Sequence, residues 1–190
     1  LLIELYKKLD YYKIEFNLES KEFYFNKLAK ANEFDIKEVI FIKRLLQVEL
    51  KKNIREIIAN ELFEEFVTND EKAFANELYM SHDQLDCLLK NGMHIGSHGY
   101  NHDWLNSLTK LEQENEIIKS INFLNIIGVY KNYTMCYPYG GHDEITMKLL
   151  RKYNFKLGLT TMFDISDIRQ NNKFQLRRLD TNHLPKKREE

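Results

Sequence analysis

MHIGSHGYNH, residues 93–102, is the stretch that decides the fold expected of this chain. Its first half, 93–97, has the pattern of a short strand, and two histidines follow where that strand ends. His98 and His102 are four residues apart on a tight turn or a first helical turn, so their imidazoles point the same way. At this spacing one cation can bind both side chains. Ordinary loop histidines, capping or solvated, are the alternative interpretation.

A second motif, CYPYGG, occupies residues 136–141 and also closes a strand-like run, 133–135. In parallel βα architectures the chemistry lies on the loops that follow the carboxyl ends of the strands. Both motifs follow the carboxyl end of a predicted strand. Together they indicate a metal-dependent hydrolase, although Pro and Gly at 138–141 are also typical of a simple turn.

MHIGSHGYNHDWL followed by CYPYGG is similar to the polysaccharide deacetylase family. These are metal-dependent carbohydrate esterases that remove N-acetyl groups from sugar polymers. The family motif His-(Ser/Thr)-x-x-His matches His98 to His102, with Gly99 in place of Ser or Thr. The Arg-x-Pro-Tyr motif matches residues 136–139, with Cys136 in place of Arg. The resemblance covers about residues 79–185.

The resemblance implies a divalent metal, with zinc expected, bound by His98, His102 and an aspartate. In the family an early Thr-Phe-Asp-Asp motif supplies this aspartate and the catalytic base. That motif is absent here, and no two aspartates are adjacent anywhere in the chain. The chain also does not begin with Met. We therefore expect a fragment of a longer protein, with the missing carboxylates upstream of it and little or no activity by itself.

Further roles are expected for residues in and near the two motifs. The main-chain N–H of Tyr139 is expected to donate to the oxyanion of the reaction. Pro138, Gly140 and Trp104 are expected to contact the substrate, an N-acetylated carbohydrate. Trp104 covering the histidine loop is the alternative. The family uses a late histidine as general acid, and His183 is the candidate, although its surroundings do not match the family motif.

Composition excludes some classes of protein. The net charge of −1 favours neither nucleic acid nor an anionic membrane as partner, and no apolar run reaches the length of a membrane span. The two cysteines, Cys87 and Cys136, are expected to be reduced thiols. We expect a bacterial protein in the cytoplasm or at the membrane periphery. An exported form stays open because the start of the protein is missing, and the oligomeric state is also open.

The chain changes pattern at Gly92. Residues 1–91 are expected to be helical, with capping boxes at Asp35–Glu38 and Ser81–Gln84. Strands then alternate with helices, as in parallel βα units. The fold class expected is α/β, the C-terminal part of a distorted (β/α) barrel carrying a large N-terminal all-helical insertion. The domains expected are the insertion at 1–91, βα units at 92–185 and a tail at 186–190. The strands expected are 93–97, 133–137, 157–161 and 175–179.

Two functions fit these observations. The first is a sugar or polysaccharide N-deacetylase, acting in carbohydrate metabolism such as surface polysaccharide biosynthesis. Long polymers, lipid-linked sugars and surface-glycan precursors all remain open as substrates. The second is a non-catalytic binding or assembly module of the same fold, in which the helical half is a partner surface. An Asp-Asp strand upstream would favour the enzyme, and its absence would favour the module.

Overall fold

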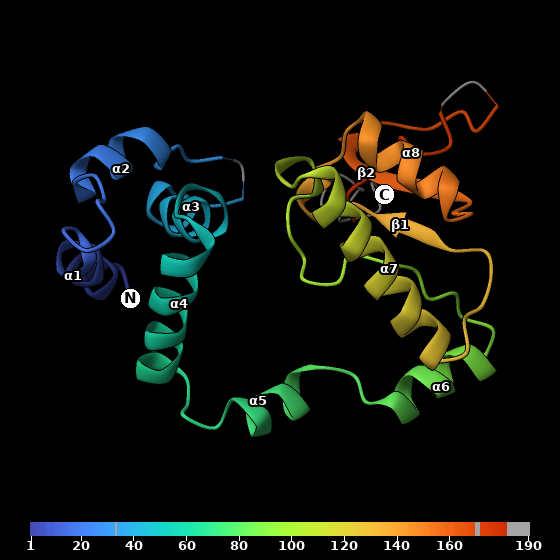
Figure 1. Cartoon of the computed structure of the whole chain (residues 1–190), viewed down its shortest axis with the longest axis horizontal. Coiled ribbons are helices and arrows are strands. Elements are labelled where there is room, and N and C mark those ends of the chain that lie inside the picture. Colours follow the sequence, from blue (N-terminus) through green and yellow to red (C-terminus); the bar gives the residue numbers. More distant parts are fainter. Residues whose placement is uncertain (33, 170–171, 182–190) are drawn as a thin grey trace, which may run out of the picture. The chain divides into compact units, whose positions relative to one another are not determined.

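The structure is a computed structural model that describes residues 1–32, 34–169 and 172–181. The chain folds as two compact units that divide between Tyr79 and Met80. Figure 1 shows both units, with most of their helices and strands labelled. Within the described residues, no helix combines the length and the apolar character needed to cross a bilayer.

The first unit is helical throughout its described secondary structure, as predicted. Ser20 caps its second helix by accepting from the Phe23 N–H at 3.1 Å. The capping box predicted at Asp35–Glu38 does not form, because the helix begins at Lys37 with Ile36 as its N-cap; the Asp35 carboxylate pairs with Lys43 at 2.6 Å. The elements are α1 (Leu2–Tyr12), α2 (Lys21–Leu28), α3 (Lys37–Arg44), the π-helical turn η1 (Leu45–Glu49), α4 (Lys52–Phe66) and α5 (Glu71–Leu78).

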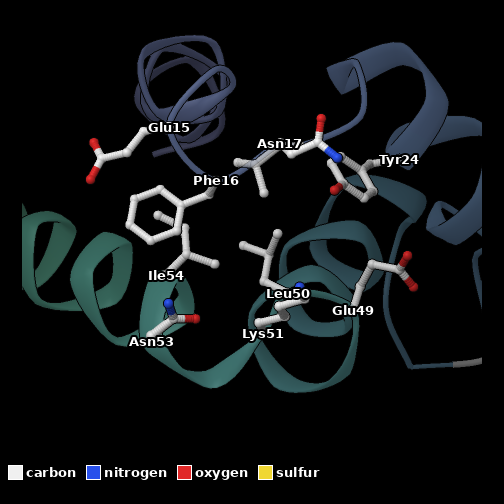
Figure 2. Close-up of a pocket in the computed structure, with 10 residues that line it drawn as sticks. Glu15, Phe16, Asn17, Tyr24, Glu49, Leu50, Lys51, Asn53 and Ile54 are labelled. Atoms are coloured by element: carbon white, nitrogen blue, oxygen red, sulfur yellow. The ribbon is translucent and has the colours of Figure 1, made fainter.

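A cavity of about 390 Å³ lies in this helical unit. Phe16, Leu50 and Ile54 form its apolar wall, and the carboxylates of Glu15 and Glu49 lie at its edge (Figure 2). None of the site residues predicted from the sequence lines it.

The second unit is a mixed α/β unit with a small parallel sheet. Its strands are hydrogen-bonded in the order β1-β2-β3, and both pairings are parallel. Three of the four predicted strands are therefore present. The elements are α6 (His82–Lys90), the short 3₁₀ turn η2 (Leu105–Ser107), α7 (Lys110–Ile126), β1 (Thr134–Cys136), the 3₁₀ turn η3 (Pro138–Gly140), α8 (Glu144–Lys152), β2 (Leu157–Phe163) and β3 (Leu176–Arg178).

The strand predicted at 93–97 is reduced to a single parallel bridge between Ser97 and Met135. Ser97 donates its N–H to the Thr134 carbonyl at 2.8 Å and accepts from the Cys136 N–H at 2.9 Å. Gly96 lies so close to β1 that a Cβ there would be 2.3 Å from the Thr134 hydroxyl. The segment still runs beside β1, and it delivers the next residue, His98, to the carboxyl end of that strand.

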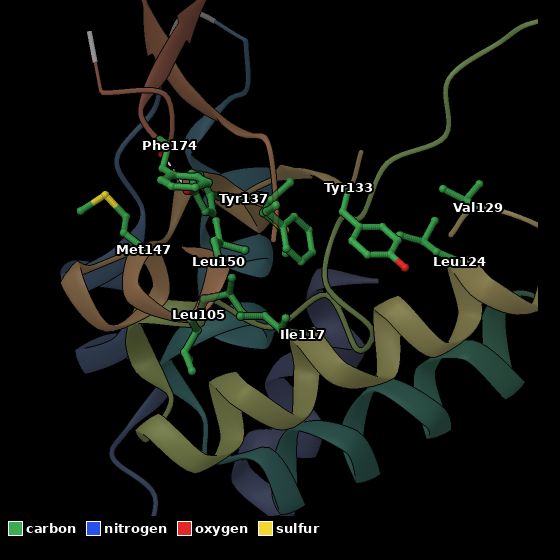
Figure 3. Close-up of a cluster of buried hydrophobic side chains, with 12 residues drawn as sticks. Leu105, Ile117, Leu124, Val129, Tyr133, Tyr137, Met147, Leu150 and Phe174 are labelled. Carbon is green, nitrogen blue, oxygen red and sulfur yellow. Dashed lines mark hydrogen bonds between the residues drawn. The ribbon is translucent and has the colours of Figure 1, made fainter. Parts of the chain in front are cut away.

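The hydrophobic core of the second unit lies between the strands and the helices α7 and α8 (Figure 3). Met135 and Tyr137 point into it and are almost fully buried. Because side chains alternate along a strand, Thr134 and Cys136 face the opposite side of the sheet. The Tyr137 hydroxyl donates to the Phe174 carbonyl at 2.7 Å, which joins β1 to the segment before β3.

The division between the units differs from the predicted boundary after residue 91. Helix α6 belongs to the second unit, where Leu89 packs against the core around α7. The capping boxes of α6 at Ser81 and of α7 at Thr109 are both present. The barrel and the insertion of the helical region into it stay predictions.

Ile117→Ala on α7 is expected to destabilise the second unit by about 2–5 kcal/mol, because removal of this fully buried side chain would leave a cavity. Ile126→Ala on the same helix removes a side chain that is 71% exposed and is the matched control. Urea denaturation of both variants measures the difference in the free energy of unfolding. Equal midpoints for the two variants would contradict this packing.

Candidate metal centre

The imidazole of His98 is held in one orientation by the neighbouring strand. Its Nδ1 lies 2.7 Å from the carbonyl oxygen of Cys136 at the end of β1. A carbonyl only accepts hydrogen bonds, so Nδ1 carries the proton. In the neutral ring Nε2 then has a free lone pair, which is the form in which histidine binds a metal.

The second imidazole converges on the same point. His102 Nε2 lies 3.0 Å from His98 Nε2, and the two ring centroids are 4.7 Å apart. Two imidazole nitrogens at this separation share a proton or face a common cation. Zinc–nitrogen bonds of about 2.05 Å in a tetrahedral site would place two ligand nitrogens about 3.3 Å apart, close to what is found here.

The electrostatics of His102 favour its neutral form. Partial burial lowers the pKa of the His102 imidazole, and the nearby His98 lowers it further, while Asp103 raises it. A metal ligand must be unprotonated, so a lowered pKa suits this role. The backbone of His102 is in the left-handed region, with φ of 61°, a conformation that the surrounding contacts have to maintain.

The two histidines fit two corners of a zinc site. Among the described residues, no cluster of three or more His, Cys, Asp or Glu side chains could hold a metal ion. This matches the absence of adjacent aspartates in the sequence. The metal centre that the donor chemistry suggests is therefore incomplete within the part of the chain that the structure describes.

The second motif forms the turn η3 directly against the histidine loop. A Cβ at Gly99 would lie 3.2 Å from Pro138 Cγ, so the two motifs touch. Tyr139 has a left-handed backbone, with φ of 55°, and Gly140 follows with φ of 77°. A side chain at Gly140 would meet the Thr161 hydroxyl of β2 at 2.2 Å, so only glycine fits. The structure thus brings the residues of both motifs together.

Aromatic contacts tie Tyr139 to the histidine loop. Its ring stacks on Trp104 with centroids 4.9 Å apart and planes 10° from parallel. The same ring meets His102 edge to face at 4.7 Å. This packing agrees with the interpretation that Trp104 covers the loop, while its contact with substrate stays a prediction.

Comparison with known proteins assigns the family. The sequence model of the family described as polysaccharide deacetylase matches residues 32–158, about two thirds of the chain. This chain belongs to the polysaccharide deacetylase family. The match begins earlier and ends earlier than the resemblance read from the motifs, and it contains both of them.

Two related proteins show how much of a family member's length this chain spans. A Bacillus subtilis (strain 168) protein named as a polysaccharide deacetylase, YxkH, is 27% identical over 90 residues, which are 47% of this chain and 32% of that protein. The Streptococcus pyogenes deacetylase PplD, solved in complex with acetate, is 26% identical with a TM-score of 0.49. That comparison covers 53% of this chain and 44% of the other. The chain therefore spans about a third of the curated relative and under half of the solved one.

Arg178 on β3 lies beside the second motif, a placement that the sequence reasoning missed. Its Nε donates to the Thr160 carbonyl at 2.9 Å, and one terminal nitrogen lies 3.8 Å from Cys136 Sγ. Cys136 is the position at which the Arg-x-Pro-Tyr motif has its arginine. Within the described residues, no carboxylate forms an ion pair with Arg178. A guanidinium therefore reaches the motif from another strand, and only the parallel pairing of β2 with β3 reveals this.

Two other histidines, His94 and His142, lie outside the convergent pair. His142 bonds through Nδ1 to the Gly140 carbonyl at 2.9 Å and stacks on Tyr137 at 4.4 Å. His94 lies 2.9 Å from the Thr134 hydroxyl through Nε2. His183, the candidate general acid, lies outside the described residues, so its role stays a prediction.

Proposed function

We propose that this chain is the histidine-bearing part of a metal-dependent deacetylase that removes N-acetyl groups from a sugar or polysaccharide. Family membership supports the class of reaction. The observation that carries the metal dependence is the convergence of His98 and His102 at 3.0 Å with His98 Nδ1 bonded to a carbonyl. The activity of the whole protein is part of this proposal, because the chain spans only part of its relatives.

The proposal gives each residue a task. His98 and His102 would hold a divalent cation, with zinc the first choice, through their Nε2 atoms. When bound, such a cation polarises the acetyl carbonyl and lowers the pKa of water toward about 7. The Tyr139 main-chain N–H would donate to the oxygen that gains charge. Pro138, Gly140 and Trp104 would shape the place where the substrate lies.

Arg178 has a proposed task in the same site. A guanidinium favours a carboxylate beside it and keeps that carboxylate ionised. Arg178 would supply, from β3, the positive charge that the family motif carries at position 136. The third metal ligand and the base would be carboxylates outside the described residues. A late histidine, with His183 the candidate, would protonate the leaving amine.

A non-catalytic module is the second candidate. The observation that favours it is that the described residues contain no third metal-binding side chain. The two candidates differ in whether any protein containing this chain releases acetate.

Acetate release from N-acetylated sugar oligomers is the test. We expect turnover by the longest protein product that contains this chain, loss of that turnover on chelation, and its return with added zinc. Residues 1–190 alone are expected to release none, because water activation needs a base as well as the cation. Absence of turnover in every product would favour the module. Chelator-sensitive turnover by residues 1–190 would show that the carboxylates lie within this chain.

A further inference from the structure

Glu116 on α7 is a buried acid that the proposed reaction does not use. Glu116 is only 5% exposed, and its side chain lies under the loop that carries the two histidines. Oε2 accepts from the main-chain N–H groups of Tyr100 at 2.9 Å and Asn101 at 2.7 Å. Oε1 accepts from the Asn101 side-chain amide at 2.5 Å. All three donors belong to Tyr100 and Asn101, which lie between His98 and His102 in the sequence.

We propose that Glu116 is a positioning residue whose carboxylate sets the shape of this loop and so brings the Nε2 atoms of His98 and His102 together. The inference rests on the proposed function, because it concerns the same cation site. It adds to that function a residue on α7, which lies more than a dozen positions along the chain from His98 and from His102.

The hydrogen bonds explain how a buried carboxylate is tolerated here. Burying a charged acid costs several kcal/mol unless hydrogen bonds compensate for the lost water. Within the described residues, Glu116 forms no ion pair with a basic side chain. Its charge is balanced by three donors of the loop, and hydrogen bonds to a charged acceptor are about twice as strong as neutral ones. The buried charge and the loop shape are therefore interdependent.

The loop itself cannot maintain its shape by local preference. Gly99 and His102 both have left-handed backbones, with φ of 75° and 61°. For a residue other than glycine this conformation costs on the order of 1 kcal/mol and persists only where surrounding contacts impose it. Glu116 fixes the two peptide groups between these residues. Without it, the two peptide groups would lose these hydrogen bonds, and the position of His102 relative to the His98 ring, which the Cys136 carbonyl holds, would be less well defined.

The first experiment measures cobalt(II) binding by residues 1–190 through the visible absorption of the bound ion and by calorimetry. Glu116→Leu is expected to weaken binding about 10- to 100-fold, the usual effect of losing a residue that orients a metal ligand. It should also alter the absorption bands, which report ligand geometry. Glu116→Gln should retain most of the affinity, because its amide oxygen can still accept from both main-chain N–H groups.

Glu116→Asp separates geometry from charge. It keeps the carboxylate but shortens the side chain by one methylene, so it should bind cobalt more weakly than Glu116→Gln. Glu114→Leu is the matched control, since Glu114 lies on the same helix and pairs with Lys152 away from the loop. It should leave the affinity and the absorption bands unchanged. A cobalt spectrum and affinity of Glu116→Leu equal to those of the unmodified chain would overturn the proposal.

Amide hydrogen exchange provides a readout that needs no metal. The Tyr100 and Asn101 amides should be protected in the unmodified chain and in Glu116→Gln, and should exchange faster in Glu116→Asp and Glu116→Leu. Unprotected amides in the unmodified chain would overturn the role of Glu116 even if cobalt binds. Failure of the unmodified chain to bind cobalt, with protected amides that depend on Glu116, would instead overturn the proposed metal function alone.

Discussion

His102→Ala is expected to remove measurable zinc binding from the chain and to lower deacetylation by the whole protein at least 100-fold. A factor of 100 corresponds to about 2.7 kcal/mol of the activation barrier. The physical reason is that the two Nε2 atoms, 3.0 Å apart, would chelate the proposed cation as a pair, so loss of either leaves a single imidazole. His98→Ala should have the same effect and should also free the Cys136 carbonyl.

Zinc titration by calorimetry and acetate release at saturating zinc measure the two halves of this prediction. His82→Ala is the matched control, because it removes an imidazole on α6 that packs near Phe123 and not at the histidine pair. Zinc affinity in the double variant His98→Ala/His102→Ala equal to that of the unmodified chain would disprove the assignment.

Arg178→Ala is expected to lower turnover about 10- to 100-fold, an effect of the size found when a group that orients a catalytic centre is lost. The guanidinium is held against Cys136 by the Thr160 carbonyl and provides positive charge at the second motif. Arg177→Ala is the matched control, since the adjacent Arg177 forms an ion pair with Asp164. Kinetics of the two variants in the whole protein give the comparison.

A rescue experiment sharpens this test. In the double variant Cys136→Arg/Arg178→Ala, the guanidinium returns to the position where the family motif has it, and turnover should recover in part. Arg178→Lys should recover less, because an ammonium lacks the planar set of donors with which a guanidinium can bond to the Thr160 carbonyl and the proposed carboxylate together. Equal turnover in Arg178→Ala and Arg177→Ala would remove Arg178 from the site.

Local sequence signals predicted most of the elements correctly. Ser81–Gln84 and Thr109–Glu112 form the capping boxes of α6 and α7, because such boxes depend only on residues three positions apart. The box predicted at Asp35 is wrong because α3 begins one residue later, with Ile36 at the N-cap position. The strand predicted at 93–97 is too long, because only Ser97 pairs with β1. The close approach of Gly96 to Thr134 is a contact between distant residues that a local pattern does not reveal.

The sequence by itself determined the two motifs, the parallel βα character of the second unit and the pair His98 and His102. These follow from short-range spacing and from the alternation of strands with helices. The tertiary structure alone decided that both Nε2 atoms meet, that Arg178 reaches Cys136 from β3, and that Glu116 lies beneath the histidine loop. The contacts of Arg178 and Glu116 join residues on different elements, and only the packing of α7 and the register of the sheet determine their distances.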